Sequence, residues 1–436
     1  MNDLRHFSNI ESSWAKLRLK YAVSLSNSRT DGDSTDFAYV GLENIESGTG
    51  RLLPKGNSPL VAKNESESVG IVNVFSVGDV LFSKLRPYLA KAFVAETTGT
   101  ATTELLVFKP NDELQGRFLL YVLLSPDFIN LVDASTFGSK MPRADWEFIG
   151  NIFIPLPSLE KQRAIAAMLD AETARLDELI AEKERLLMLL AEKRRALITR
   201  AVTRGLDADA PLRDSGLEWL GDVPEHWKLV KLKYLAIVRT GVAKGRDLKN
   251  QQTIFVPYLR VANVQDGYLN LGDVTEIEIL PHELKAYSLQ PGDVLMNEGG
   301  DIDKLGRGAV WNNEISPCLH QNHVFAVRCK KVWPIWLSII TSATYAKAYF
   351  ESHAKRTTNL ASISATNIQE LLIVMPPEDE QRAIVAYIAA ETRKLDEMQE
   401  VTARTIGLLK ERRAALIAAA VTGQIDVKQE RQKPAR

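Results

Sequence analysis

The sequence predicts an α+β protein in which two β-rich globular domains are separated by two long helices that pair antiparallel. Three observations predict this arrangement: an internal repeat of half the chain, two long stretches of helix-forming residues, and short β-branched runs bounded by turn residues elsewhere. The chain has 436 residues, of which 45% are hydrophobic and 25% charged. This composition supplies enough apolar material for packed cores and excludes a wholly disordered chain.

The repeat is strongest between residues 162 and 207. Gln162 to Ile165 (QRAI) recurs as Gln381 to Ile384, 219 positions later, and the same offset holds without a gap to the end of the segment. What precedes each copy matches more faintly, as when WAKLRLKY at 14–21 recurs as WKLVKLKY at 227–234. A period this long is not a solenoid repeat, so the chain is a duplicated half-molecule with a pseudo-twofold axis.

The duplication sets the expected boundaries, taken in chain order. We expect a first globular domain at 1–157, a helix at 158–206, a second domain at 207–376, a second helix at 377–426 and a frayed tail at 427–436. Prolines precede both helices, and Gly205 and Gly423 close them. A helix of this size is about 60 Å long.

The helical segments carry apolar residues at alternating spacings of three and four, which is typical of a coiled coil. The predicted packing positions are Ile165, Leu169, Leu176, Leu179, Leu186, Leu190 and Leu197 in the first helix, and Ile384, Ile388, Leu395, Leu409 and Leu416 in the second. We call each row of apolar packing positions a seam. Because the two seams match, the simplest interpretation is that the two helices pair with each other.

The globular segments contain strand-like runs such as 71–75, 77–82, 105–108 and 323–327, and a helix is expected late in each, at 117–124 and 333–350. Trp14 and Trp227 occupy equivalent places and are interpreted as core residues.

Catalytic motifs are not visible in the sequence. There is no GxxxxGK[ST] loop for ATP, and Cys318, His320, His323 and Cys329 do not have zinc-finger spacing, so no metal site is expected. The two cysteines do not make a disulfide framework, no apolar run is long enough for a membrane helix, and no signal peptide is visible, so we expect a cytoplasmic protein.

The charge balance bears on nucleic-acid binding. Residues 1–157 carry 15 Lys and Arg against 18 Asp and Glu, and residues 207–376 carry 18 against 19. Phosphate neutralisation supplies much of DNA affinity, so tight binding by this chain alone is not expected. Local clusters remain, and the largest is the run of seven basic residues between Lys228 and Lys249. Each cluster could equally be a solvated face.

Several motifs together resemble the specificity subunit of Type I restriction–modification systems. They are GLEWLGDVPEHW at 216–227, the helix entries IPLPSLEKQRAI at 154–165 and MPPEDEQRAI at 375–384, the helix ends at 194–207 and 412–426, and the paired GDVL turns at 78–81 and 292–295. One departure is that no Pro-Glu-His precedes Trp14. The resemblance covers essentially the whole chain.

The resemblance implies a non-catalytic subunit with two target-recognition domains, each reading one half of a split double-stranded DNA site, and a helical spacer that docks two adenine-N6 methyltransferase subunits. Restriction/translocase subunits would complete the enzyme. No cofactor is expected in this chain, and the partner subunits would use S-adenosylmethionine, and ATP with Mg²⁺. Since residues 82–86 (FSKLR) differ from 296–300 (MNEGG), we predict an asymmetric target.

The candidate DNA-binding residues follow from the clusters and from the polar loop positions. They are Lys84, Arg86, Lys91, Lys140, Arg143, Lys244, Arg246, Arg307, His320, Asn322, Lys355 and Arg356. His320 and Asn322 could bind bases or stabilise a turn. Two alternatives stay open: a coiled-coil scaffold without sequence-specific DNA binding, and a fused methyltransferase or nuclease, for which the motifs are missing.

Overall fold

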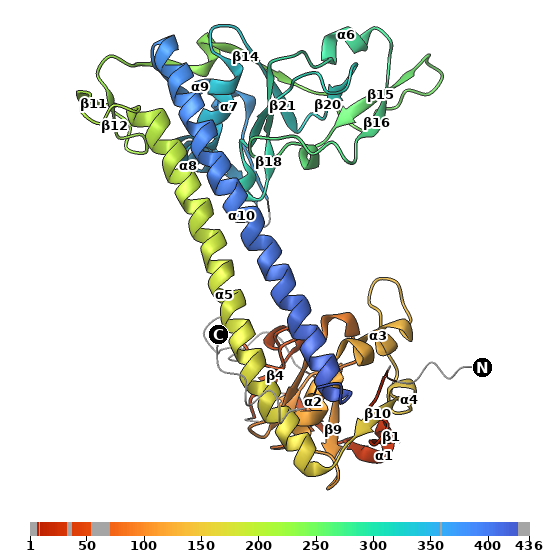
Figure 1. Ribbon diagram of the computed structural model, residues 1–436. Helices are drawn as coiled ribbons and strands as arrows, with labels where there is room; N and C mark the ends of the chain where they lie inside the picture. The colour runs from red at the N-terminus through yellow and green to blue at the C-terminus, as the bar shows by residue number, and fades with distance from the viewer. Residues whose placement is uncertain (1–6, 8, 33–36, 54–69, 358–359, 426–436) are drawn as a thin grey trace. The chain divides into compact units, whose positions relative to one another are not determined.

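The computed structural model describes residues 7, 9–32, 37–53, 70–357 and 360–425, and the predicted tail at 427–436 lies outside them. The chain divides into two units, residues 1–184 with 403–436 and residues 185–402. Each unit contains one globular domain and a part of each long helix (Figure 1).

The first domain is built on two four-stranded sheets. The first sheet has the order β2-β9-β6-β7, formed by Val23–Leu25, Leu105–Pro110, Val80–Ser83 and Ala92–Val94. The second has the order β3-β5-β8-β4, formed by Arg29–Asp31, Ile71–Phe75, Gly99–Ala101 and Tyr39–Val40. A third pair joins β1 (Ala15–Arg18) to β10 (Phe153–Leu156). The helices are α1 (Leu19–Ala22), α2 (Gly116–Leu124), α3 (Pro126–Ala134) and α4 (Trp146–Ile149).

The second domain repeats the first of these four-stranded sheets and differs in the others. Its central sheet has the order β14-β21-β17-β19, formed by Ala236–Thr240, Val324–Cys329, Asp293–Asn297 and Gly308–Val310. Further sheets join β16-β15-β20 (Thr275–Ile279, Ile254–Leu259, Leu319–His320), β18-β23-β22 (Gly299–Gly300, Ala361–Ser362, Lys355–Arg356), β13-β24 (Lys228–Lys231, Leu372–Met375) and β11-β12 (Leu212–Asp214, Asp222–Pro224). The helices are α6 (Glu283–Tyr287), α7 (Pro334–Ser342), α8 (Thr344–His353) and α9 (Ala365–Glu370).

Two sequence expectations need correction in detail. The helix expected at 333–350 is two helices, because Ala343 between α7 and α8 has extended backbone (ψ 148°). The strand expected at 77–82 begins only at Val80, because Gly78 turns the chain with a φ of 87°.

The long helices α5 (Leu159–Arg204) and α10 (Glu378–Val421) contain 46 and 44 residues. Gly423 ends α10 in a left-handed conformation, with φ at 81°. The amide of Gly423 donates to the carbonyl of Ala420, and the amide of Gln424 donates to that of Ala419. This pair of bonds is a Schellman cap, which satisfies the last carbonyls of a helix. The helix therefore ends five residues before the expected residue 426.

Within each unit the two helices run antiparallel. In the first unit Asp177 of α5 pairs with Arg413 of α10, and Glu184 pairs with Lys410. The later residue of α5 thus meets the earlier residue of α10, as in an antiparallel pair. In the second unit Arg194 pairs with Asp396. The paired helices are the coiled coil that the seams predict.

The residues that are buried between the two helices differ in part from the predicted packing positions. Of the predicted positions in α5, Ile165, Leu169, Leu176 and Leu190 are buried, and Leu186 and Leu197 are half-buried. Leu179, however, is 37% exposed, while the next residue, Ile180, is 8% exposed. One residue is about 100° of helix rotation, so the partner helix covers Ile180 and leaves Leu179 outside. In α10, Ile384, Ile388 and Leu395 are buried, and Leu409 and Leu416 are half-buried.

Each domain core includes helix ends. The core of the first domain contains Ile165, Leu169, Ile417 and Val421, and that of the second contains Ile198, Val202, Ile384 and Ile388. Trp227 is 1% exposed, and Trp14 is half-buried against the first core. Each tryptophan ring packs at a helix-closing glycine, since a Cβ on Gly205 would lie 3.1 Å from Trp227 and one on Gly423 would lie 2.8 Å from Trp14. Trp227 is therefore the core residue that was predicted, whereas Trp14 packs at the edge of the first core.

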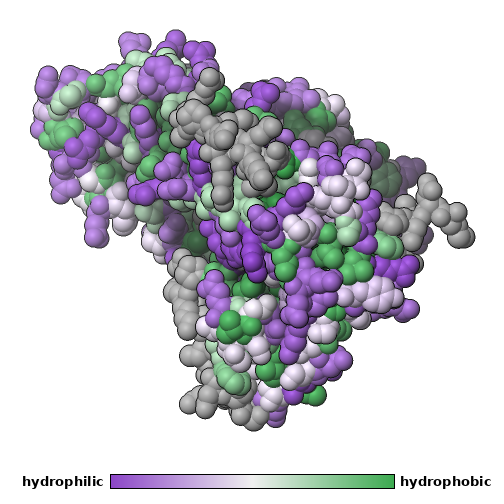
Figure 2. Space-filling model, turned by 60° about the horizontal axis from the view of Figure 1, so that its bottom comes forward, coloured by the Kyte–Doolittle hydropathy of each residue, from purple (hydrophilic) through white to green (hydrophobic). Residues whose placement is uncertain are grey.

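Among the described residues, no helix is long and apolar enough to cross a membrane. In the view of Figure 2, hydrophobic residues are scattered among hydrophilic ones over the visible surface.

Candidate nucleic-acid interface

In the first domain two loops meet beyond the end of β6. One loop, residues 84–91, follows β6, and the other, residues 137–143, precedes α4. The amide of Arg86 donates to the carbonyl of Pro142 (2.8 Å), and the amide of Ala144 donates to that of Lys84 (2.9 Å). These bonds bring two loops that are far apart in sequence next to each other. One loop contains the predicted residues Lys84 and Arg86, and the other contains Lys140 and Arg143.

The first of these loops has strained backbone. Arg86 and Ala90 have φ angles of 49° and 47°, and they flank a 3-10 turn at Pro87–Leu89. Residues other than glycine rarely adopt this left-handed conformation, and when they do it is often at binding sites. The strain identifies the loop as a candidate for binding, and it leaves the side chains of Arg86 and Tyr88 exposed.

Two of the predicted basic residues have structural partners. The guanidinium of Arg143 forms two bonds with the carboxylate of Glu104, at 2.9 and 3.2 Å, which fixes the base of the 137–143 loop. The ammonium of Lys91 donates to the carbonyl of Leu42, and burial lowers the pKa of Lys91. Lys91 is therefore part of the domain's internal bonding, whereas Arg86 and Lys140 are exposed.

The same loops carry exposed apolar side chains that the sequence reasoning missed. Tyr88, Phe137 and Met141 are 52%, 64% and 49% exposed. Aromatic rings next to basic side chains are a common way to contact nucleic acid, because a ring can stack on a base while the cation binds phosphate. The available signal was the alternation of aromatic, apolar and basic residues in LRPYLAK (85–91) and TFGSKMPR (136–143).

The second domain places equivalent loops together. The segment after β17 includes β18, which pairs with β23 of the hairpin formed by β22 and β23. This contact brings the loop that contains Arg307 next to the hairpin that contains Lys355 and Arg356. Both hairpin residues are exposed, and Arg307 is half-buried.

Next to this hairpin lies a polar group centred on Glu298. Its carbonyl accepts from the amide of Ile363 (2.8 Å), and its amide donates to the carbonyl of His323 (2.9 Å). The carboxylate of Glu298 bonds with Nδ1 of His323 at 2.7 Å. Asn322 is half-buried beside the exposed His323. Carboxylate, amide and imidazole groups can all read base edges, and neither Glu298 nor His323 was among the predicted DNA-binding residues.

The prediction for His320 is wrong. Its side chain is 2% exposed, and its Nδ1 bonds with the carbonyl of Val324 at 2.6 Å. Burial lowers the pKa of His320 to about 4, so the ring is neutral near pH 7. His320 lies on β20, which pairs with β15 inside the domain, and it therefore belongs to the core.

The basic run at 228–249 is largely used inside the second domain. Lys231 and Lys233 both pair with Glu370, at 2.6 and 2.5 Å. The guanidinium of Arg246 forms two bonds with Glu283, which lower the pKa of that carboxyl. Arg246 and Lys244 are both exposed in this loop, and Glu283 holds the guanidinium of Arg246.

The chain is similar to several known proteins. A family model for the Type I restriction modification DNA specificity domain matches residues 42–187. The specificity subunit of the Type I restriction enzyme EcoKI from Escherichia coli K12 is 23% identical over 332 residues, which cover 75% of this chain and 69% of that one. The MjaVIII specificity subunit from Methanocaldococcus jannaschii is 22% identical over 400 residues, covering 90% and 87%.

A solved structure shares the fold. It comes from work on complex assembly and conformational transition of the type I R-M system, and it superposes with a TM-score of 0.71 at 21% identity, covering 95% of this chain and 99% of that one. Residues 42–187 thus match a Type I DNA specificity domain, the chain is similar over most of its length to Type I specificity subunits, and it shares the fold of that solved structure.

Proposed function

We propose that each globular domain of this chain reads one half of a split, asymmetric site on double-stranded DNA. The observation that carries the proposal is that the two domains form equivalent loop surfaces from different residues. Relatives of this chain are named specificity subunits, so we assign it the non-catalytic role of selecting the place at which its partners act.

The chemistry of the two surfaces supports an asymmetric target. The first surface combines Arg86 and Lys140 with the exposed rings of Tyr88 and Phe137. The second combines Glu298, Asn322 and His323 with the basic hairpin of β22 and β23. Arginine prefers the acceptors of guanine, whereas a carboxylate accepts from the amino group of cytosine or adenine. Surfaces so different in donors and acceptors favour different half-sites.

The long helices support docking of two copies of one partner. Exposed apolar side chains recur at the 219-residue offset: Leu179 (37% exposed) corresponds to Met398 (49%), and Leu189 (52%) corresponds to Leu408 (57%). The first unit holds Leu179 and Leu408, and the second holds Leu189 and Met398. Each unit thus offers one such residue from each helix. We assign these equivalent places to two adenine-N6 methyltransferase subunits.

The cofactors of the reaction are assigned to the partners. The methyltransferase subunits would bring S-adenosylmethionine, and restriction/translocase subunits would bring ATP with Mg²⁺. The described part of this chain contains no group of three or more His, Cys, Asp or Glu residues arranged to hold a metal ion.

The test is to co-express the chain with a candidate methyltransferase subunit in a host without other adenine methylation and to map N6-methyladenine across the genome. We expect a split, asymmetric motif that appears only when this chain is present. If a demonstrably active partner produced no motif, or the same motif without this chain, the scaffold alternative would replace the proposal.

A further inference from the structure

One ion pair between the long helices occurs twice, once in each unit. Asp177 and Arg413 form it in the first unit, and Asp396 and Arg194 form it in the second. The two aspartates are 219 residues apart in the sequence, and so are the two arginines. The pairs are therefore related by the internal repeat, and any difference in their surroundings is a difference between the two halves of the chain.

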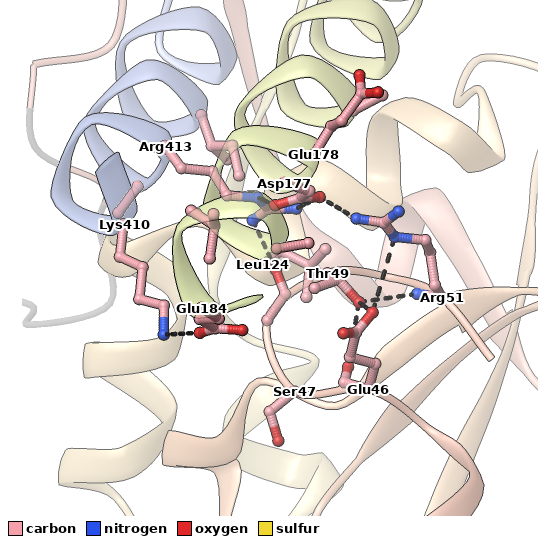
Figure 3. A pocket seen from close by; sticks show the side chains of 16 residues that line it. Glu46, Ser47, Thr49, Arg51, Leu124, Asp177, Glu178, Glu184, Lys410 and Arg413 are labelled. Atoms are coloured by element: carbon pink, nitrogen blue, oxygen red, sulfur yellow. Dashed lines mark hydrogen bonds and ion pairs between the residues drawn. The ribbon is translucent and has the colours of Figure 1, made fainter. Parts of the chain in front are cut away.

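In the first unit this pair also holds the first domain. Nη1 of Arg413 donates to the carbonyl of Gly48 at 2.7 Å, while its Nε donates to Asp177 at 2.8 Å. Asp177 accepts a further bond from Arg51. Gly48 and Arg51 belong to the loop at 46–51, so three segments meet at one carboxylate and one guanidinium (Figure 3).

The junction depends on charge more than on apolar packing. The side chains of Arg413 and Asp177 are 11% and 13% exposed, so water screens their interaction weakly. Beside them lies a cleft of about 580 Å³, lined by the loop and by both helices. The bonds from Arg51 to Asp177 and from Arg413 to Gly48 join the loop to the helices beside this cleft.

In the second unit the equivalent loop bonds elsewhere. Gly267 corresponds to Gly48, and both have positive φ, at 85° and 74°. The amide of each glycine donates within its own domain, from Gly48 to the carbonyl of Ala90 and from Gly267 to that of Gly308. The loops differ because Asp266 binds Lys347 of α8 and Ser342 of α7, at 2.6 and 2.7 Å, whereas the carbonyl of Gly48 accepts from Arg413. Arg194 bonds with Asp396 and so joins helix to helix.

The position of the junction along the helices gives it mechanical leverage. The first domain core already includes Leu169 and Val421. Asp177 lies eight residues beyond Leu169, and Arg413 lies eight residues before Val421, which is about 12 Å along each helix. The first domain is therefore held to the helices at two points along their axis, the core and the junction. A domain held at both points cannot tilt about either point alone.

We propose that Arg413 and Asp177 are positioning residues that hold the first recognition domain at one angle on the helix pair, through the loop at 46–51. This inference rests on the proposed function: the angle contributes to the number of base pairs allowed between the two half-sites. The Arg194–Asp396 pair joins the helices without this effect on the second domain.

The test uses the full chain with its methyltransferase subunits and plasmids that carry both half-sites at the native spacing or with one base pair removed or added. Wild-type protein is expected to methylate the native spacing preferentially. In Arg413→Ala the ratio of methylation at the native spacing to that at the neighbouring spacings should fall at least fivefold, with both half-site sequences unchanged. Arg194→Ala, the matched control, should keep the ratio within about twofold of wild type.

Equal ratios in the two variants, or a uniform loss at every spacing in Arg413→Ala alone, would overturn the positioning role. Far-UV circular dichroism checks that each variant folds. If Arg413→Ala does not fold, the isosteric variant Asp177→Asn, compared with Asp396→Asn, supplies the same contrast. Absence of any split motif with the wild-type chain would instead refute the proposed function itself, so the two failures are distinguishable.

Discussion

The buried ring of His320 makes a quantitative prediction about stability and pH. Its pKa is about 4 in the folded chain, whereas an unperturbed histidine has a pKa of about 6.5. Well above pH 6.5 the ring is neutral in both the folded and the unfolded chain, so it does not make the free energy of unfolding depend on pH. As the pH falls below 6.5, the unfolded chain binds a proton that the folded chain does not bind until about pH 4. Stability is therefore lost as the solution becomes acidic.

From these two pKa values, protonation of His320 stabilises the unfolded state relative to the folded state by about 1 kcal/mol at pH 6 and about 2 kcal/mol at pH 5. The variant His320→Gln has an uncharged side chain of similar size that does not titrate. It should therefore lose less stability than wild type between pH 7 and pH 5, by about 2 kcal/mol.

The assay is urea unfolding of both proteins at pH 7, 6 and 5, with the transition of the second domain followed separately. His282→Gln, a change of an exposed histidine, serves as the control for replacing a histidine by glutamine. Parallel pH profiles for wild type and His320→Gln would refute the reasoning, because a ring that titrates equally in both states cannot be a buried core group.

Further predictions concern the helices and the two DNA-reading surfaces. Ile180→Ala should destabilise the helix pair by about 2 to 4 kcal/mol, whereas Leu179→Ala should cost less than about 1 kcal/mol; similar losses in thermal unfolding would contradict the seam register. Leu186→Pro should cost about 3 kcal/mol or more and abolish partner docking or half-site spacing; size-exclusion chromatography of the complex checks this, and unchanged assembly and target would refute the role of the coiled coil. Arg86→Ala should weaken or relax methylation at one half-site and His323→Ala at the other, each by about 1 to 3 kcal/mol if the side chain contacts a base; an effect of either change on both half-sites in the methylation map would count against separate reading. Exchanging residues 14–157 for another recognition domain should change one half-site only, and sequencing-based mapping of N6-methyladenine would show a change in both if the domains were not modular.

Local chemistry explains why some features could be predicted from the sequence. Helix propensity is a property of each residue and its neighbours, so the composition of 162–202 was enough to predict α5. Gly205 and Gly423 stop the helices because only glycine takes a positive φ without strain. The 219-residue repeat implied two domains of one plan, and the sheets β2-β9-β6-β7 and β14-β21-β17-β19 share one strand order.

Long-range packing explains what the sequence reasoning missed. The sequence offered Leu179 and Ile180 as neighbouring candidates for the seam, and only the surface of the partner helix selects between them. His320 looked available for DNA, but the fold buries it, and Arg246 is exposed but paired with a carboxylate 37 residues away. In each case a group distant in the sequence determined the outcome.

The repeated ion pair shows both kinds of feature, those set by the sequence and those set by the tertiary structure. By itself, the sequence determined the helices, their caps and the duplication, and so placed Arg194 and Arg413 at equivalent positions, because these features depend on residues close together in the chain or on direct repetition. Only the tertiary structure decided that Arg413 also binds the loop at Gly48, and that Lys84 and Arg86 meet Lys140 and Arg143 in one surface. The reason is physical: hydrogen bonds and ion pairs form over a few ångströms of space, and the fold alone sets which distant segments come that close.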